Sequence, residues 1–195
     1  MQPEQVMERL RATEALLEGH FQLSSGRHSD RYVQCARLLA VTPVAAEVGA
    51  ALAARLPADL DLIVSPAMGG LIIGHEVARA RRLPFYFTER EAGAMVFRRG
   101  FAVPPGARCA VVEDVVTSGG SLLEAAAALR AAGGVLVAAA AIVDRSGTAP
   151  PDFGVPFVSL LRLEVKNWEP ADCPLCAAGS TAIKPGSRHL GQGKG

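Results

Sequence analysis

Between residues 59 and 165, short apolar runs alternate with stretches of helical pattern, and this rhythm limits the possible folds most strongly. The apolar runs are continuous, as in Val135–Val143, rather than interleaved with polar residues. Continuous runs are typical of strands whose two faces are both covered by helices. Strands that alternate with helices pair in parallel through right-handed crossovers. The sequence therefore predicts an α/β fold, with an open parallel sheet flanked by helices.

The expected elements follow one another closely along the chain. An amphipathic helix over Glu4–Glu18 and a second helix from Thr42 to about Leu56 precede the alternating region. A charged excursion over residues 89–100 is expected to form a hairpin or mobile loop. The expected strands are residues 60–65, 85–87, 109–112, 135–143 and 157–161, and the expected helices are residues 71–81 and part of 119–132.

The bulk properties exclude several classes of protein. The 195 residues fit one domain, with an N-terminal segment (1–40), an α/β core (41–165) and a C-terminal tail (166–195). A net charge of +1 argues against a general nucleic-acid or membrane-surface binder. No apolar run reaches the ~18 residues of a membrane span, and the N-terminal residues lack the apolar stretch of a secretory signal. We therefore expect a cytoplasmic protein without nucleic-acid or membrane partners.

One segment carries most of the chemical information. Glu113 and Asp114 leave an apolar strand, and the loop Thr117-Ser118-Gly119-Gly120-Ser121 then opens a helix. Small residues at a helix N-terminus let backbone N–H groups converge on a phosphate. The two carboxylates would repel a phosphate, but they are suited to accept hydrogen bonds from the hydroxyls of an attached sugar. The segment therefore indicates a ribose 5-phosphate site, and the alternative is a solvated acidic pair beside a helix cap.

Two common nucleotide motifs are absent from the sequence. No Gly-Lys-Ser/Thr triplet is present, which excludes a Walker A loop, and no GxGxxG follows an apolar run. Residues 111–121, which include the acidic pair, resemble the phosphoribosyl diphosphate (PRPP) motif of type I phosphoribosyltransferases. The resemblance implies that PRPP is bound by Glu113, Asp114, Val115, Val116, Thr117, Ser118, Gly119, Gly120 and Ser121.

Two further segments resemble the same family. Ser65–Gly70 resembles its pyrophosphate loop, which implies that Ala67, Met68 and Gly69 contact PRPP. The stretch Gly19–Ser29, together with Tyr32, resembles the N-terminal motif of orotate phosphoribosyltransferases, and Asp144-Arg145 resembles their base loop. Residues 1–40 would then form a hood that recognises the base.

The same resemblance implies which residues bind orotate. These are Thr117, Arg145, Ser25 and Gly26, and Arg145 would recognise the carboxylate through its planar fork. The alternative for Arg145 is an ion pair with the adjacent Asp144.

The charged loop departs from the family pattern. Many members carry a catalytic lysine there, whereas residues 88–100 contain neither Lys nor His. Only three of the 20 basic residues in the chain are lysines, Lys166, Lys184 and Lys194. Arg90 is the candidate for contact with pyrophosphate, with Arg98 and Arg99 as alternatives. The expected catalytic residues are therefore Glu113, Asp114 and Arg90.

The resemblance also implies a reaction, a cofactor and an assembly. The reaction is the transfer of ribosyl 5-phosphate from PRPP to N1 of orotate in pyrimidine biosynthesis, giving orotidine 5′-monophosphate and pyrophosphate. The cofactor is Mg²⁺, held mainly by PRPP or pyrophosphate rather than by protein side chains. The partners are PRPP, orotate and a second copy of the chain, in a homodimer whose loop 89–99 reaches the neighbouring site.

Two alternatives stay open from the sequence. One is a phosphoribosyltransferase for another base, a purine or uracil, although Arg145 favours an acidic base. The other is a non-catalytic regulator that senses PRPP and binds nucleic acid, although the neutral charge and the absence of an added module disfavour it.

The four cysteines fit an intracellular chain. Cys35 and Cys109 lie in apolar surroundings and are expected to be buried. Cys173 and Cys176 form a CxxC pair, for which we consider zinc binding, a reactive dithiol or a simple turn. His189 is a possible third zinc ligand, and the sequence indicates no fourth.

Overall fold

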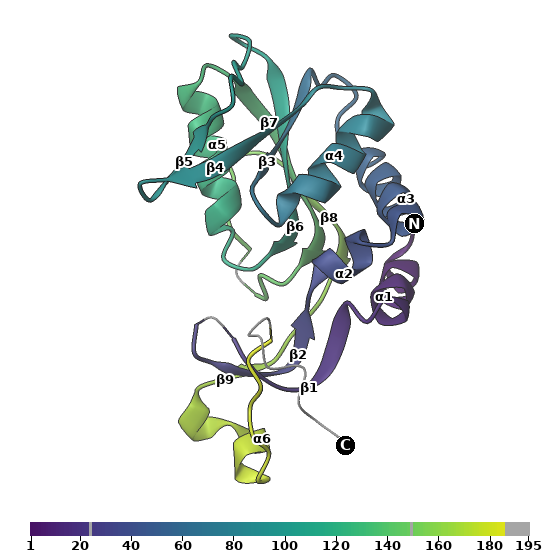
Figure 1. Cartoon of the computed structure of the whole chain (residues 1–195), viewed down its shortest axis with the longest axis vertical. Helices are drawn as coiled ribbons and strands as arrows, with labels where there is room; N and C mark the ends of the chain where they lie inside the picture. The colour runs from purple at the N-terminus through teal and green to yellow at the C-terminus, as the bar shows by residue number, and fades with distance from the viewer. Residues whose placement is uncertain (24, 149, 186–195) are drawn as a thin grey trace.

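The computed structural model describes residues 1–23, 25–148 and 150–185. Figure 1 shows a larger part built on one sheet and a smaller part below it, where a second sheet and the C-terminal segment meet. The larger sheet has six strands, and the smaller sheet has three.

The larger sheet confirms the predicted α/β class. Its strands are parallel except for the pairing of β4 with the edge strand β5. The strand order is β5 (Ala94–Phe97), β4 (Phe85–Glu91), β3 (Leu62–Pro66), β6 (Arg108–Val116), β7 (Val135–Asp144) and β8 (Phe157–Arg162). The charged excursion at 89–100 forms the β4–β5 hairpin.

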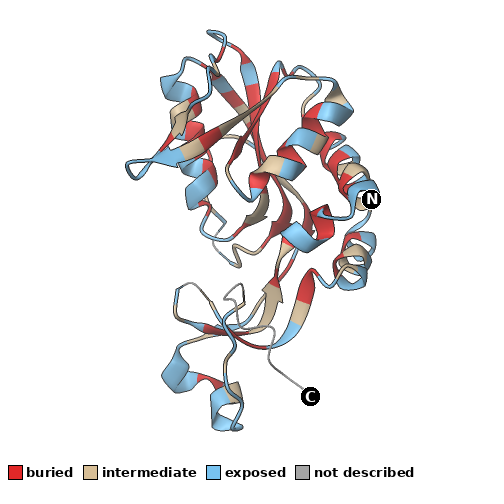
Figure 2. Cartoon of the chain, viewed as in Figure 1, coloured by how far each residue is buried: buried red, intermediate tan, exposed pale blue. Residues whose placement is uncertain are grey.

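Helices cover both faces of this sheet, which is why its strands read as continuous apolar runs. Ala110 and Val112 of β6 join a core cluster with α1 (Pro3–Ala12), α2 (Cys35–Leu39), α3 (Thr42–Ala53) and α4 (Gly70–Arg81). Cys109 and Val111 point to the opposite face, against α5 (Gly120–Ala131). Figure 2 shows the result as buried strands between helices that are exposed on their outer sides. Cys35 and Cys109 are both buried, as expected.

The smaller sheet brings together segments that are far apart in the sequence. The strands β1 (Leu16–Gln22) and β2 (His28–Val33) form an antiparallel hairpin, and β9 (Asn167–Trp168) pairs with β2. The chain continues into a 3-10 helix, η1 (Pro170–Asp172), and a single helical turn, α6 (Pro174–Ala177). Ile183 then bridges back to Phe21. We call this part, residues 16–33 and 167–183, the small lobe.

The helix expected over Glu4–Glu18 is wrong in its second half. The helix α1 ends at Ala12, Glu14 has a positive φ of 50°, and the Ala15 N–H donates to the Leu10 carbonyl. Leu16 and Leu17, which have helical spacing in the sequence, pair with Val33 and Tyr32 in the hairpin. Tertiary pairing therefore overrides the local pattern.

No helix among the described residues is both long and apolar enough to span a membrane.

Candidate functional site

The centre of the larger sheet contains the point where the strand order reverses. From β3 the chain first builds β4 on one side and then returns to place β6 on the other side. The helix that follows β3 and the helix that follows β6 lie on opposite faces, so their N-termini flank a crevice at the carboxyl ends of the strands. Such a switch point is where open α/β sheets bind ligands.

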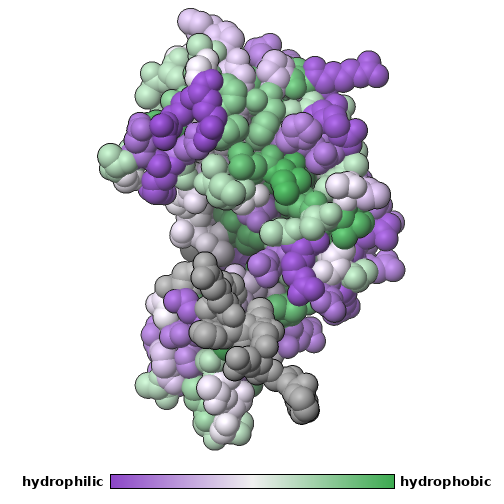
Figure 3. Space-filling model, in the orientation of Figure 1, coloured by the Kyte–Doolittle hydropathy of each residue, from purple (hydrophilic) through white to green (hydrophobic). Residues whose placement is uncertain are grey.

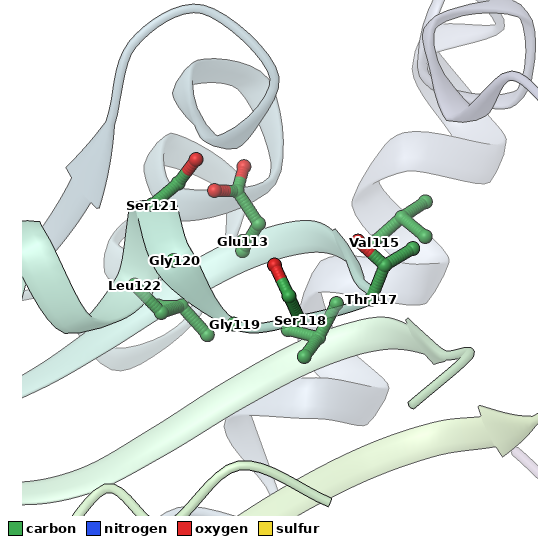
Figure 4. Close-up of a pocket in the computed structure, with 9 residues that line it drawn as sticks. Glu113, Val115, Thr117, Ser118, Gly119, Gly120, Ser121 and Leu122 are labelled. Atoms are coloured by element: carbon green, nitrogen blue, oxygen red, sulfur yellow. The ribbon is translucent and has the colours of Figure 1, made fainter. Parts of the chain in front are cut away.

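The end of β6 opens into a pocket with an empty volume of about 280 Å³. Figure 4 shows the Glu113 carboxyl group on the same side as the hydroxyls of Ser118 and Ser121. The pocket is lined by Glu113, Val115, Val116, Thr117, Ser118, Gly119, Gly120, Ser121 and Leu122. It therefore brings together nearly all of the residues predicted to hold the 5-phosphate, at the N-terminus of α5.

Gly119 is required by the shape of this loop. It has φ of 77° and ψ of 4°, and it precedes the first residue of α5. A Cβ at this position would meet Pro151 Cγ at 2.6 Å. Both the left-handed conformation and the lack of space exclude a side chain here.

The loop after β3 lies directly against the two carboxylates. A Cβ on Gly69 would lie 2.7 Å from an Asp114 carboxylate oxygen and 3.1 Å from a Glu113 carboxylate oxygen. A Cβ on Gly70 would meet the Val112 carbonyl oxygen at 2.9 Å. The loops predicted for pyrophosphate and for ribose 5-phosphate thus converge on one place. The Ala67–Met68 peptide bond in this loop is cis, and the Ala67 N–H is occupied, because it donates to the Thr88 carbonyl.

Ionisation of the acidic pair is costly because of its surroundings. Burial, and then repulsion from Asp114, raise the pKa of Glu113 to about 8. Burial also raises the pKa of Asp114, against the lowering effect of the Val115 N–H, which donates to its carboxylate at 2.8 Å. Carboxylates held at such cost in a crevice are typical of functional sites.

We expect Glu113→Gln to stabilise the free protein increasingly as the pH rises. The folded pKa of about 8 lies above the ordinary 4.5, so the folded state binds more protons than the unfolded state between these values. The free energy of unfolding of the wild-type protein therefore falls as the pH rises through this interval. Gln does not ionise, so the free energy of unfolding of the variant should exceed that of wild type by about 2–4 kcal/mol above pH 8.

Urea denaturation of both proteins at pH 5 and pH 8.5 measures this gain. The exposed Glu8→Gln serves as the matched control and should show no pH-dependent difference from wild type. If the free energy of unfolding of Glu113→Gln differed from that of wild type by the same amount at both pH values, the raised pKa of Glu113 would be contradicted.

Arg145 lies on the other side of the crevice, after β7. Arg145 is half-buried, and its buried Nε has no hydrogen-bond partner among the described residues. Burial lowers the pKa of Arg145 from its ordinary value. The adjacent Asp144 accepts hydrogen bonds from the backbone N–H and the hydroxyl of Ser146, at 2.9 and 2.6 Å, and does not pair with Arg145. The ion-pair alternative is therefore wrong, and a buried donor is left for an external acceptor.

Arg145 lines a second cavity, with an empty volume of about 1240 Å³. The cavity lies between the small lobe and the larger sheet, and Figure 3 shows the surface hollowed between the two parts. It is lined by Asp30, Arg31, Arg145, Ser146, Gly147, Thr148, Glu164, Val165, Lys166 and Asn167. Asp30 also has a buried carboxylate oxygen that finds no hydrogen-bond partner in the described part of the chain. Asp30, Arg31 and Lys166 are not among the site residues predicted from the sequence, although Asp30 and Arg31 lie directly between the quoted stretch Gly19–Ser29 and Tyr32.

The remaining predicted residues lie outside these two cavities. Ser25 and Gly26 occupy the turn between β1 and β2, where the Gly26 N–H donates to Leu23. Arg90 lies in the β4–β5 hairpin and forms an ion pair with Glu124 of α5. Arg99 and Arg98 also form ion pairs, with Glu89 and Glu91.

Comparison with known proteins places these features in a family. The phosphoribosyl transferase domain model matches residues 38–175. The chain is 51% identical to an orotate phosphoribosyltransferase of Heliobacterium modesticaldum, over 96% of this chain and 100% of the relative. It is 53% identical to an orotate phosphoribosyltransferase of Sphingopyxis alaskensis, over 97% of this chain and 99% of the relative.

Solved structures agree with these relatives. An orotate phosphoribosyltransferase from Aeropyrum pernix superposes with a TM-score of 0.67 at 29% identity, covering 81% of this chain and 93% of that one. An orotate phosphoribosyltransferase from Mycobacterium tuberculosis has a TM-score of 0.66 at 25% identity, covering 83% of this chain and 97% of that one.

Proposed function

The chain belongs to the orotate phosphoribosyltransferases, and from this premise we propose which of its residues bind PRPP and orotate. The reaction transfers the ribosyl 5-phosphate group from PRPP to N1 of orotate and yields orotidine 5′-monophosphate and pyrophosphate. The relatives at about half identity all bear this one activity, so the alternatives of another base and of a PRPP-sensing regulator are set aside. The observation that carries the residue assignment is the convergence, at one crevice, of a small pocket at the start of α5, an acidic pair and an arginine whose buried Nε lacks a hydrogen-bond partner among the described residues.

The phosphate end of the substrate is assigned to the start of α5. Backbone N–H groups of residues 117–121 and the hydroxyls of Ser118 and Ser121 would hold the 5-phosphate, helped by the helix dipole. Glu113 and Asp114 would accept hydrogen bonds from the ribose hydroxyls. Binding energy from the phosphate, remote from the reacting bond, would then orient the anomeric carbon.

The base is assigned to Arg145 and the small lobe. The Arg145 guanidinium would donate to the orotate carboxylate, and Thr117 lies at the neighbouring strand end. Ser25 and Gly26 lie in the turn between β1 and β2, and we assign them to the base from the resemblance of this stretch to the family.

Charge separation explains the catalysis. As the bond at the anomeric carbon breaks, positive charge develops on the ribose ring and negative charge on pyrophosphate. The carboxylates of Glu113 and Asp114 would face the ribose, and the backbone of Met68 and Gly69 would face the pyrophosphate, since Gly69 lies directly against both carboxylates. Arg90 would contribute by leaving Glu124 for the departing pyrophosphate. Orotate is already anionic at neutral pH, so the site needs no dedicated base.

The site also fits Mg²⁺ as the cofactor. The fit rests on the buried carboxylate of Glu113 and the half-buried carboxylate of Asp114, whose pKa values are raised chiefly by burial, and on the preference of this hard cation for oxygen donors. Mg²⁺ would be held mainly by PRPP, near Glu113 and Asp114, and when bound it supplies electrostatic stabilisation of the pyrophosphate.

We also propose a cytoplasmic homodimer in which the β4–β5 hairpin reaches the neighbouring site. Figure 3 shows hydrophobic side chains gathered near the middle of one face. Met68 and Ile72, at the start of α4, expose 80% and 46% of their surfaces. Exposed apolar residues of this kind are typical of an interface.

A structure of the protein with orotidine 5′-monophosphate tests the residue assignments. We expect the phosphate on the N–H groups of residues 117–121, the ribose on Glu113 and Asp114, and the carboxylate of the base on Arg145. A phosphate bound away from the first turn of α5 would contradict the assignment.

A further inference from the structure

The small lobe holds its shape without a hydrophobic core of its own. Among the described residues, the buried side chains at its centre are mostly polar or sulfur-containing. They are His20, His28, Ser29, Cys173 and Phe21, each less than 9% exposed, whereas the buried Leu16 and Val33 of the hairpin pack into the core of the larger part. None of the five belongs to either core cluster of the larger part. Units this small usually need a disulfide or a metal in addition to apolar burial.

Four possible metal ligands meet inside this lobe. His20 comes from β1, His28 from β2, Cys173 from the position between η1 and α6, and Cys176 from α6. Their ligand atoms all lie within 4.8 Å of one another. His20 Nε2 lies 3.0 Å from His28 Nδ1, 3.4 Å from Cys173 Sγ and 3.8 Å from Cys176 Sγ. Cys176 Sγ lies 3.3 Å from His28 Nδ1.

These separations match the edges of a tetrahedron around zinc. With ordinary Zn–N and Zn–S bonds, tetrahedral ligands lie about 3.4 Å apart for two nitrogens and about 3.6 Å apart for nitrogen and sulfur. The observed nitrogen–nitrogen distance is 3.0 Å, and the nitrogen–sulfur distances run from 3.3 to 3.8 Å. Small movements of the side chains would therefore be sufficient to admit the ion.

Hydrogen bonds alone do not satisfy this cluster. His20 Nε2 faces the other three ligand atoms at once, whereas a ring nitrogen makes one good hydrogen bond. Burying polar groups with incomplete partners is costly. A single cation at the centre would satisfy all four groups together.

The outer contacts also fit a metal ligand. His20 Nδ1, the ring nitrogen that points away from the cluster, lies 3.2 Å from the Ser180 hydroxyl. Histidines bound to metals usually hold their second ring nitrogen in such a hydrogen bond, which fixes the orientation of the ring.

We propose that His20, His28, Cys173 and Cys176 bind one structural Zn²⁺ ion. Two thiolates and two imidazoles in a tetrahedron select zinc, and a closed set of four ligands is typical of a structural rather than a catalytic site. On binding, the two cysteine thiols would release two protons to solvent. The ion would tie the β1–β2 hairpin to the C-terminal segment and keep the small lobe beside the crevice. His189, considered as a ligand from the sequence, lies outside the described residues.

Metal analysis of the untagged full-length protein tests this proposal without any assay of turnover. We expect about one zinc per chain after dialysis, as for a tight structural site. The double variant Cys173→Ser/Cys176→Ser should lose the zinc, whereas the exposed His75→Ala, a histidine outside the cluster, should keep it. Cobalt substituted into the wild-type protein should show thiolate charge-transfer bands and the strong visible bands of a tetrahedral site.

Three results would overturn the proposal. They are wild-type protein free of zinc or loaded with iron instead, a Cys173–Cys176 disulfide detected by mass spectrometry, and full zinc content in the double variant. The wild-type stoichiometry decides the matter even where the double variant fails to fold. Hydrogen exchange adds a positional readout, because chelation should deprotect β9 and α6 while β6 and β7 stay protected.

Discussion

Replacing Asp114 by Asn should lower kcat/KM for PRPP and orotate by about 10²-fold or more, the range for a lost electrostatic contact in a transition state. Asn keeps the size of the side chain but removes a negative charge beside the ribose. The loss should fall mainly on kcat, because positive charge develops on the ribose ring only as the bond to pyrophosphate breaks. Steady-state kinetics with both substrates varied measure the effect.

The matched control for this variant is Asp59→Asn, at the opposite end of the same sheet. Asp59 is exposed and pairs with Arg108 at 2.8 Å, at the amino end of β6. This variant should keep wild-type kinetics. Wild-type turnover in Asp114→Asn would place the ribose elsewhere.

Replacing Arg145 by Ala should also cost about 10²-fold in kcat/KM for orotate. The reason is the buried Nε of Arg145, which has no partner among the described residues and is therefore a donor available to a carboxylate. The Michaelis constant for orotate should rise far more than that for PRPP, because the phosphate pocket at α5 is left intact.

Arg145→Lys sharpens this test. Lysine keeps the positive charge but not the planar fork, so it should restore only part of the lost orotate affinity. Equal increases in the Michaelis constants of both substrates for Arg145→Ala would indicate a structural role, and unchanged kinetics would remove Arg145 from the site.

The central part of the fold could be predicted because its information is local. The strands at 60–65, 109–112 and 135–143 and the helix at 71–81 appear in the structure with shifts of a few residues at their ends. Each is an apolar or amphipathic run bounded by Gly, Pro or charged residues, so sequence pattern and tertiary burial agree. The acidic pair and the loop at 117–121 were found for the same reason, as one contiguous segment.

The small lobe could not be predicted because it depends on contacts between distant segments. Leu16 and Leu17 suit a helix locally, but pairing with β2 places them in a strand. The strand β9 has only two residues, Asn167 and Trp168, and exists through its pairing with His28 and Ser29. His20 and Cys173 are 153 residues apart, so no spacing rule connects them.

The ion-pair partners of the arginines in the β4–β5 hairpin could not be predicted either. From the sequence, Arg90 is predicted to contact pyrophosphate, with Arg98 and Arg99 as alternatives. In the structure Arg90, Arg98 and Arg99 each pair with a glutamate, and one of these partners, Glu124, lies in α5. Composition gives the charges of a segment, whereas their partners depend on the fold.

Turnover of PRPP with four bases tests the central claim most directly. The purified chain, with Mg²⁺ and PRPP, is given orotate, uracil, adenine or hypoxanthine, and the change in base absorbance is followed together with pyrophosphate release. We predict turnover of orotate, with one pyrophosphate released for each orotidine 5′-monophosphate formed, and no comparable turnover of the other three bases. Turnover of uracil or a purine without turnover of orotate would contradict the account.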